Sequence, residues 1–173
     1  MNFVLDTGIF VRGLAHWNKE LDTASTDTKF KKVIDIILTN CDTLLISGEI
    51  LKECRSKKII PGFAGDRFMS VYLHFKMIIK KSYGKHKIKE IGRSITEKIK
   101  SDENFRDTMN DLEDYDKYDE KLLTCAAAGK SDRVVIISAD RAWAGKQLKI
   151  KTKFRREVTT IIFKHIDDFL ENY

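Results

Sequence analysis

Four short, mainly apolar runs along the chain predict buried β-strands. They lie at residues 2–5, 43–46, 134–137 and 158–163. Because consecutive rather than alternate positions are apolar, both faces of these strands are expected to be covered, as in a parallel sheet. Elsewhere, apolar residues spaced by three and four predict amphipathic helices. These helices are expected at residues 28–38, 48–55, 118–128 and 141–148.

A longer helical region is predicted in the middle of the chain. From residue 62 to residue 100, apolar residues recur every three or four positions, which predicts two or three helices broken near Gly84. Pro61 and Gly62 mark the loop that leads into them. We therefore interpret residues 56–112 as a helical insertion.

Strands that alternate with helices predict an α/β fold with three layers, α/β/α, around a central, mainly parallel sheet. A chain of 173 residues is long enough for one domain with a substantial core. We expect a single domain that spans residues 1–173.

The cysteines indicate the compartment. Cys41, Cys54 and Cys125 are odd in number, widely spaced and form no CxxC pair. We expect buried thiols in a reducing compartment, without disulfides or zinc. The sequence has no signal-peptide pattern and no run of eighteen apolar residues. These features predict a cytoplasmic protein with no membrane segment.

Charge is distributed unevenly along a chain whose formal net charge is +6. Residues 52–100 hold fourteen Lys and Arg against four acids, residues 101–120 hold nine acids against two bases, and residues 145–156 hold six cations and no acid. Basic surfaces beside an acidic cluster suit a protein that grips phosphates around a metal site. The alternative is a lysine-rich surface that is merely solvated.

Two aspartates follow predicted strands. Asp6 ends the string FVLD, and Asp140 ends the string VIISAD. In open parallel sheets, ligands bind beyond the carboxyl ends of the strands, so both side chains are candidates for a functional site. Each could instead cap the helix that follows it.

Further acids belong to two predicted helices. Glu49 and Glu53 are four residues apart and therefore share one helix face. Asp119 begins another helix, and Asp116 lies shortly before it. A single carboxylate at that position would also complement the helix dipole.

If Asp6, Glu53, Asp119 and Asp140 converge, they need a compensating positive charge to stay ionised together. Their hard oxygen atoms suit Mg²⁺ or Mn²⁺. A site of this kind can activate a water molecule and stabilise the attacking and leaving oxygens of a phosphodiester. The pattern predicts hydrolysis without a covalent enzyme intermediate.

The order of these motifs resembles the PIN-domain family of metal-dependent ribonucleases. That family has an Asp, often followed by Thr or Ser, after its first strand, as in Asp6-Thr7. It carries a Glu in the helix after its second strand, where SGEILKEC gives Glu53 the matching position.

The later motifs of the family are similar as well. Its third acid begins a helix of the form Asp-x-x-Leu-x-x-x-Ala, which Asp119 begins here, and its fourth ends a Thr/Ser-x-Asp motif, matched at Ser138 to Asp140. The strand and helix expected in EVTTIIFKHIDDFLENY resemble the usual end of the family. The resemblance covers the chain except roughly residues 56–112.

The resemblance implies an endoribonuclease that uses Mg or Mn as its cofactor. The implied catalytic and metal-binding residues are Asp6, Glu53, Asp119 and Asp140, with Glu49 and Asp116 in reserve. Thr7 and Ser138 are expected to position a water molecule or a metal ligand. A basic strip after the last acid is a predicted phosphate-binding surface, formed by Lys146, Lys149, Lys151, Lys153, Arg155 and Arg156.

RNA is the expected substrate, and three roles stay open. The first is processing of ribosomal or other RNA, which the long basic insertion favours over a compact toxin. The second is the toxin of a toxin–antitoxin pair, inhibited by an antitoxin protein. The third is a PIN-like module that binds RNA or protein without cutting. Besides RNA, the expected partners are an antitoxin protein or a second copy of the chain in a homodimer.

Overall fold

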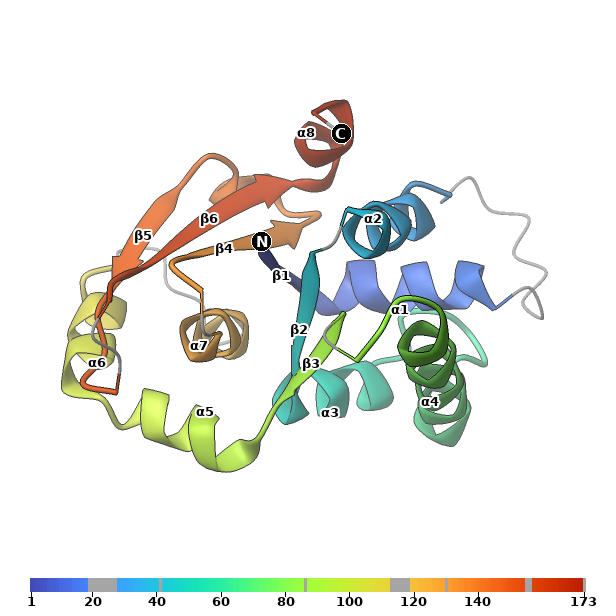
Figure 1. Cartoon of the computed structure of the whole chain (residues 1–173), viewed down its shortest axis with the longest axis horizontal. Coiled ribbons are helices and arrows are strands. Elements are labelled where there is room, and N and C mark those ends of the chain that lie inside the picture. The colour runs from blue at the N-terminus through green and yellow to red at the C-terminus, as the bar shows by residue number, and fades with distance from the viewer. Residues whose placement is uncertain are drawn as a thin grey trace.

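A computed structural model describes residues 1–18, 28–40, 42–85, 87–112, 119–129, 131–154 and 157–172, and these residues form an α/β fold around one sheet (Figure 1). The strand order is β3-β2-β1-β4-β6-β5. Neighbouring strands are parallel except β5 and β6, which are antiparallel. The strands are β1 (Asn2–Leu5), β2 (Thr43–Ser47), β3 (Ile88–Ile91), β4 (Arg133–Ser138), β5 (Gln147–Ile150) and β6 (Thr159–His165).

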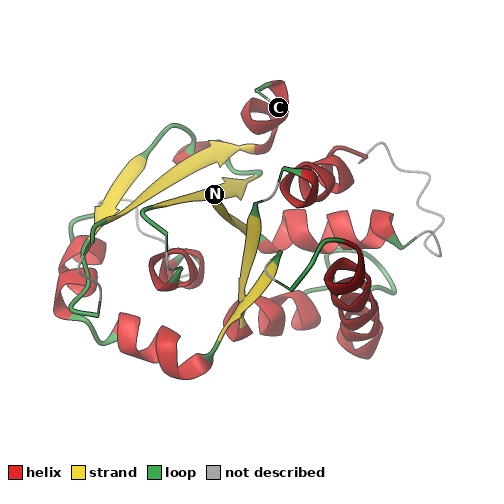
Figure 2. Cartoon of the chain, in the orientation of Figure 1, coloured by secondary structure: helices red, strands yellow, loops and turns green. Residues whose placement is uncertain are grey.

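Helices cover both faces of this sheet. They are α1 (Thr7–Trp17), α2 (Thr28–Thr39), α3 (Gly48–Ser56), α4 (Gly65–Ser82), α5 (Arg93–Lys100), α6 (Glu103–Asn110), α7 (Glu120–Ala128) and α8 (Ile166–Glu171), with a short 3-10 helix, η1 (Arg141–Trp143). Helix α7 packs on β1, β2, β4 and β6, and α5 packs against α7. Helices α1, α2 and α8 lie on the other side (Figure 1), and Figure 2 shows the strands between helices on both sides. The three-layer α/β/α prediction is confirmed.

The centre of the sheet explains the apolar runs in the sequence. Phe3, Val4 and Leu5 of β1 are at most 2 % exposed, and residues 134–137 of β4 are at most 3 % exposed. Strands buried on both faces need apolar side chains at every position. All four predicted strands are present: β1 has the predicted bounds, and the bounds of β2, β4 and β6 are shifted by one or two residues.

The chain changes direction across the sheet between β1 and β4. It runs outward from β1 to β2 and β3, and then returns to place β4 on the other side of β1. In open α/β sheets, such a switch point leaves a crevice at the carboxyl ends of the two strands. The residues that follow β1 and β4 therefore occupy the position where a ligand site is expected.

Two segments differ from the predictions. Within residues 56–112, helices α4, α5 and α6 are present, but Ile88–Ile91 is not helical and forms β3, which extends the sheet beside β2. The helix predicted at residues 141–148 is wrong: it stops after η1, because Gly145 has a φ of +78°, and Gln147–Ile150 forms β5.

Two of the three cysteines lie in the described residues. Cys54 and Cys125 are free and buried, as predicted, and burial raises the pKa of both thiols. Cys41 lies outside the described residues. Within the described ranges, each helix is too short or too polar to cross a membrane.

Candidate active site

Asp6 lies at the switch point and is held from the neighbouring strand. Leu5 and Ile137 are paired in the β1–β4 register, and the Asp6 N–H donates to the Ile137 carbonyl at 3.0 Å. The Ser138 hydroxyl donates to Oδ2 of Asp6 at 3.2 Å. Asp6 precedes α1, yet its side chain makes no capping hydrogen bond. The capping alternative does not account for this carboxylate.

Asp140 has a different environment. Its N–H donates to the Ser138 hydroxyl at 3.0 Å, and its Oδ1 accepts a hydrogen bond from the Ala142 N–H at 2.9 Å. One oxygen of Asp140 therefore caps η1, as the alternative reading of the sequence allowed. Ser138 contacts both Asp6 and Asp140 and so couples the ends of β1 and β4.

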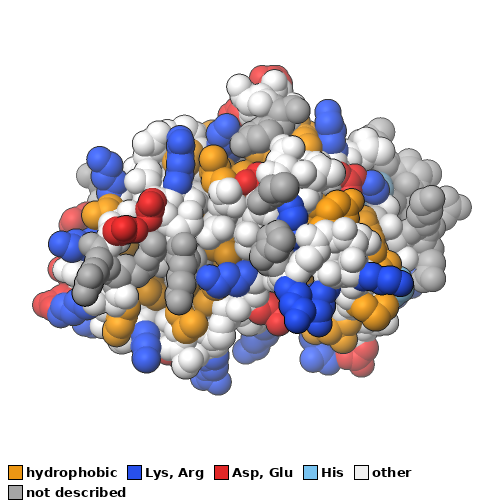
Figure 3. All heavy atoms as spheres, in the orientation of Figure 1, with side chains coloured by type: hydrophobic (Ala, Val, Ile, Leu, Met, Phe, Trp, Pro, Cys, Tyr) orange, Lys and Arg blue, Asp and Glu red, His pale blue; other side chains and the backbone are white. Residues whose placement is uncertain are grey.

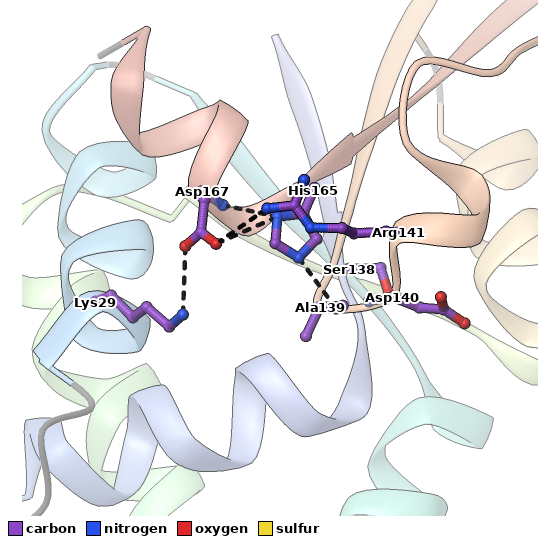
Figure 4. Close-up of polar contacts among 7 residues, drawn as sticks. All are labelled: Lys29, Ser138, Ala139, Asp140, Arg141, His165 and Asp167. Carbon is purple, nitrogen blue, oxygen red and sulfur yellow. Dashed lines mark hydrogen bonds and ion pairs between the residues drawn. The ribbon is translucent and has the colours of Figure 1, made fainter.

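The turn from Ser138 to Asp140 rests on a polar cluster (Figure 4). His165 is 6 % exposed, and its Nε2 lies 3.1 Å from the carbonyl oxygen of Ala139. Its Nδ1 accepts a hydrogen bond from the Asp167 N–H at 3.3 Å, so the proton belongs on Nε2, which donates to Ala139. Figure 4 shows the Asp140 carboxylate pointing away from His165. The cluster thus holds the turn on the side opposite to the Asp140 carboxylate.

Asp119 joins Asp6 and Asp140 at one cavity. It precedes α7 and, like Asp6, makes no capping hydrogen bond with its side chain. The cavity has a volume of about 240 Å³. Its walls combine carboxylates, lysines and apolar groups: Asp6, Lys57, Asp119, Lys121, Leu122, Ile136, Ser138, Asp140, Trp143 and Phe163. Three of the four predicted acids therefore share one cavity at the carboxyl ends of β1 and β4.

Glu53 is bound by cations instead. Lys121 Nζ lies 2.6 Å from Oε2 of Glu53, and Lys57 forms an ion pair with Oε1. The buried Thr7 hydroxyl donates to Oε2 at 2.8 Å. Burial alone would raise the pKa of Glu53, but hydrogen bonds from these three residues outweigh it, and the pKa lies below its usual value of 4.5.

Other predicted residues lie elsewhere. Glu49 is paired with Lys100 at 2.6 Å and lines a separate cavity between α3 and α5. Asp116, Arg155 and Arg156 lie outside the described residues. The remaining members of the basic strip are exposed: Lys146, Lys149, Lys151 and Lys153.

Two members of that strip have defined contacts. Lys146 Nζ lies 5.1 Å from the ring centre of Trp143, which lines the cavity. Lys153 is paired with Glu103 at 2.8 Å. On the face shown in Figure 3, Lys and Arg side chains are spread widely, and Asp and Glu side chains appear in fewer places. This distribution is compatible with binding a polyanion.

Sequence reasoning missed the two lysines of the cavity. Lys57 follows Glu53 by four residues and Lys121 follows Asp119 by two, so helix spacing placed the first within reach of Glu53. The approach of Lys121 to Glu53 depends on how α7 packs against α3, which no local pattern encodes. The contact of His165 with the Ser138–Asp140 turn was missed for the same reason.

Asp6, Asp119 and Asp140 fit a divalent cation by their chemistry, because carboxylate oxygens are the ligands that Mg²⁺ and Mn²⁺ prefer. They line one cavity, but among the described residues no three Asp, Glu, His or Cys side chains lie close enough to form a ready metal site. The fit therefore extends to three of the four predicted ligands, whereas Glu53 already has two ammonium partners.

Comparisons with protein-family models, curated proteins and solved structures gave no match.

Proposed function

We propose that this protein is a metal-dependent endoribonuclease that hydrolyses phosphodiester bonds in RNA. One observation carries the proposal: Asp6, Asp119 and Asp140, from three separate segments, line a single cavity at the switch point of the sheet. Carboxylates grouped in this way favour a cation, and lysines in the same wall favour a phosphate.

The residues that line the cavity have different proposed roles. The Ser138 hydroxyl donates to the Asp6 carboxylate and accepts from the Asp140 N–H, while the Asp140 carboxylate accepts from the Ala142 N–H. A bound Mg²⁺ or Mn²⁺ would supply an activated water molecule and neutralise charge that develops on the phosphate. Asp6, Asp119 and Asp140 would hold that ion, and the apolar wall of Trp143 and Phe163 would limit access of bulk water.

RNA as the substrate is supported by charge. The net charge of +6 and the wide spread of Lys and Arg side chains in Figure 3 favour a long polyanion over a small neutral substrate. A reducing, cytoplasmic location is part of the proposal, because the free, buried Cys54 and Cys125 suit it. Nothing in the described ranges favours an antitoxin partner or a homodimer, so both partners stay predictions. A role in RNA processing stays a prediction as well.

The test is RNA cleavage by the purified protein with Mg²⁺, with Mn²⁺ and with EDTA. We expect wild-type protein to cut a labelled single-stranded RNA with either metal, and Asp6→Asn together with Asp140→Asn to lower the rate by about 100-fold or more. Asp107→Asn, at an exposed position of α6, is the matched control and should keep the wild-type rate.

The result that would overturn the proposal is a wild-type protein that cuts neither RNA nor flapped DNA with either metal. If that protein still binds RNA, the chain is a binding module that does not cut. Asp6→Asn with Asp140→Asn should then leave RNA binding unchanged.

A further inference from the structure

The positive charge around Glu53 exceeds what is needed to neutralise one carboxylate. Two ammonium groups and one hydroxyl converge on it, from Lys57, Lys121 and Thr7. Glu53 and Lys121 are almost equally buried, with 13 % and 14 % of their side chains exposed, whereas Lys57 is 49 % exposed. The three charged groups together carry a net charge of +1.

Both lysines also belong to the wall of the cavity that Asp6, Asp119 and Asp140 line, but Glu53 does not. Lys121 enters this wall from the first turn of α7, and Lys57 enters it from the end of α3. Glu53 thus holds two ammonium groups at the edge of the carboxylate site. An ion pair with a purely structural role needs only one lysine and no access to a cavity.

We infer that Lys121 and Lys57 form a phosphate-binding subsite and that Glu53 is a positioning residue that holds them, rather than a metal ligand. The inference rests on the proposed nuclease function and names how that site takes its substrate. The ligand is a phosphate group of the RNA backbone next to the bond that is cut. Thr7 completes the subsite by fixing the Glu53 carboxylate from α1.

The chemistry of the groups supports this division. An ammonium group is a compact point charge that binds phosphate oxygens without a fixed orientation. A carboxylate with two ammonium partners has little remaining negative charge with which to attract a second cation. The carboxylates lining the cavity and the lysine pair would therefore attract different parts of the reaction: the cation and the phosphate.

The first experiment measures binding of a fluorescein-labelled single-stranded RNA in EDTA over a series of salt concentrations, so that no cleavage interferes. We expect Lys121→Met to weaken binding several-fold and to lower the slope of log K against log salt by about 0.7, the value for one lost phosphate contact on a single strand. Lys121→Arg should keep the slope. Lys58→Met removes an exposed lysine next to Lys57 that does not line the cavity, and should also keep it.

The second experiment measures Mn²⁺ affinity by titration calorimetry. We expect Glu53→Gln to bind Mn²⁺ within about twofold of wild type, and Asp6→Asn to bind it about tenfold or more weakly. If Lys121→Met destabilises the fold, Glu53→Gln with Lys121→Met removes both charges together, and its slope should still fall by about 0.7.

The outcomes separate the two proposals. A loss of Mn²⁺ affinity in Glu53→Gln as large as in Asp6→Asn would overturn the inference, and so would an unchanged salt slope in Lys121→Met. A wild-type protein that neither binds Mn²⁺ nor cuts RNA would overturn the nuclease proposal, while the salt slope would still decide whether Lys121 binds phosphate.

Discussion

Glu53 illustrates at the scale of one residue how a largely buried carboxylate is kept ionised. Its desolvation is offset by donors from α1 and α7 and by Lys57 at the end of its own helix. Because these donors lower its pKa in the folded state, the ionised form contributes stability that the unfolded chain lacks. The contribution is present above the usual pKa of 4.5 and is lost as the pH falls through the lower, folded-state value.

Ionised Glu53 is therefore expected to stabilise the fold at neutral pH. Glu53→Gln should lower the free energy of unfolding at pH 7 by about 1–2 kcal/mol, between the values typical of exposed and buried ion pairs. The difference from wild type should shrink as the pH falls from 4.5 through the lower, folded-state pKa. Urea unfolding at pH 7, 5 and 3.5 measures both. A difference that stays constant across this range would contradict the assigned ion pairs.

His165 links the end of the chain to the candidate site. Its Nε2–H donates to Ala139 and its Nδ1 accepts from the Asp167 N–H (Figure 4). We predict that His165→Phe lowers the free energy of unfolding by about 1–3 kcal/mol, because it leaves two polar backbone groups without partners. Lys29→Ala removes a partly exposed ion pair to Asp167 and should change the free energy of unfolding by less than about 1 kcal/mol. Chemical denaturation measures both variants. Equal losses of stability in His165→Phe and Lys29→Ala would argue against His165 as the residue that holds the turn at Ala139.

At the scale of elements, the sequence predicts the buried strands better than the edge strands. Strands β1, β2, β4 and β6 each contain three or more consecutive apolar residues, as burial of both sheet faces requires. Strand β3 was missed because Ile88 and Ile91 are three residues apart, as in a helix, and β5 because Gln147–Ile150 is short and half polar. Both lie at sheet edges and owe their conformation to pairing with β2 and β6, which is a tertiary effect.

Close packing of α1 against α2 depends on a glycine. A Cβ atom at Gly13 would lie 2.6 Å from Cδ1 of Ile34 and 2.9 Å from the carbonyl oxygen of Phe30. Gly8 is in the same helix, but a Cβ atom there would meet nothing within 4 Å. The two positions therefore form a matched pair for testing the helix contact.

We predict opposite effects for these glycines. Gly13→Ala should lower the free energy of unfolding by about 1–2 kcal/mol, because overpacking outweighs the better helix propensity of Ala. Gly8→Ala should raise it by about 0.5–1 kcal/mol. Thermal unfolding of both variants measures the difference, and a stabilised Gly13→Ala would show that α1 and α2 are not this close.

At the scale of the whole molecule, the sequence predicts the position of the site better than the side-chain contacts within it. Asp6 and Asp140 follow strands that prove to be neighbours at the switch point, so strand-end reasoning was sufficient to bring them together. Asp119 joins them because α7 packs across the central strands. The pairing of Glu53 with Lys121 could not be predicted, because it joins side chains of α3 and α7 that are far apart in the sequence.

Distant parts of the chain are also joined away from the site, at Asp102. This side chain is 2 % exposed. Its Oδ1 accepts from the Phe105 N–H at 3.2 Å and so caps α6, while its Oδ2 accepts from the Lys153 N–H at 2.7 Å. One carboxylate therefore fastens the segment after β3 to the connection between β5 and β6, which lies 51 residues further along the chain.

We predict that Asp102→Ala lowers the free energy of unfolding by about 2–3 kcal/mol, because it removes a helix cap and leaves the Lys153 N–H without its acceptor. Asp102→Asn keeps one acceptor oxygen and should lose less. Asp107→Ala, at an exposed position of α6, should change stability by less than about 0.5 kcal/mol. Urea unfolding of the three variants measures these changes in the free energy of unfolding and ranks them. If Asp102→Ala lost no more stability than Asp107→Ala, the two segments would not depend on this carboxylate.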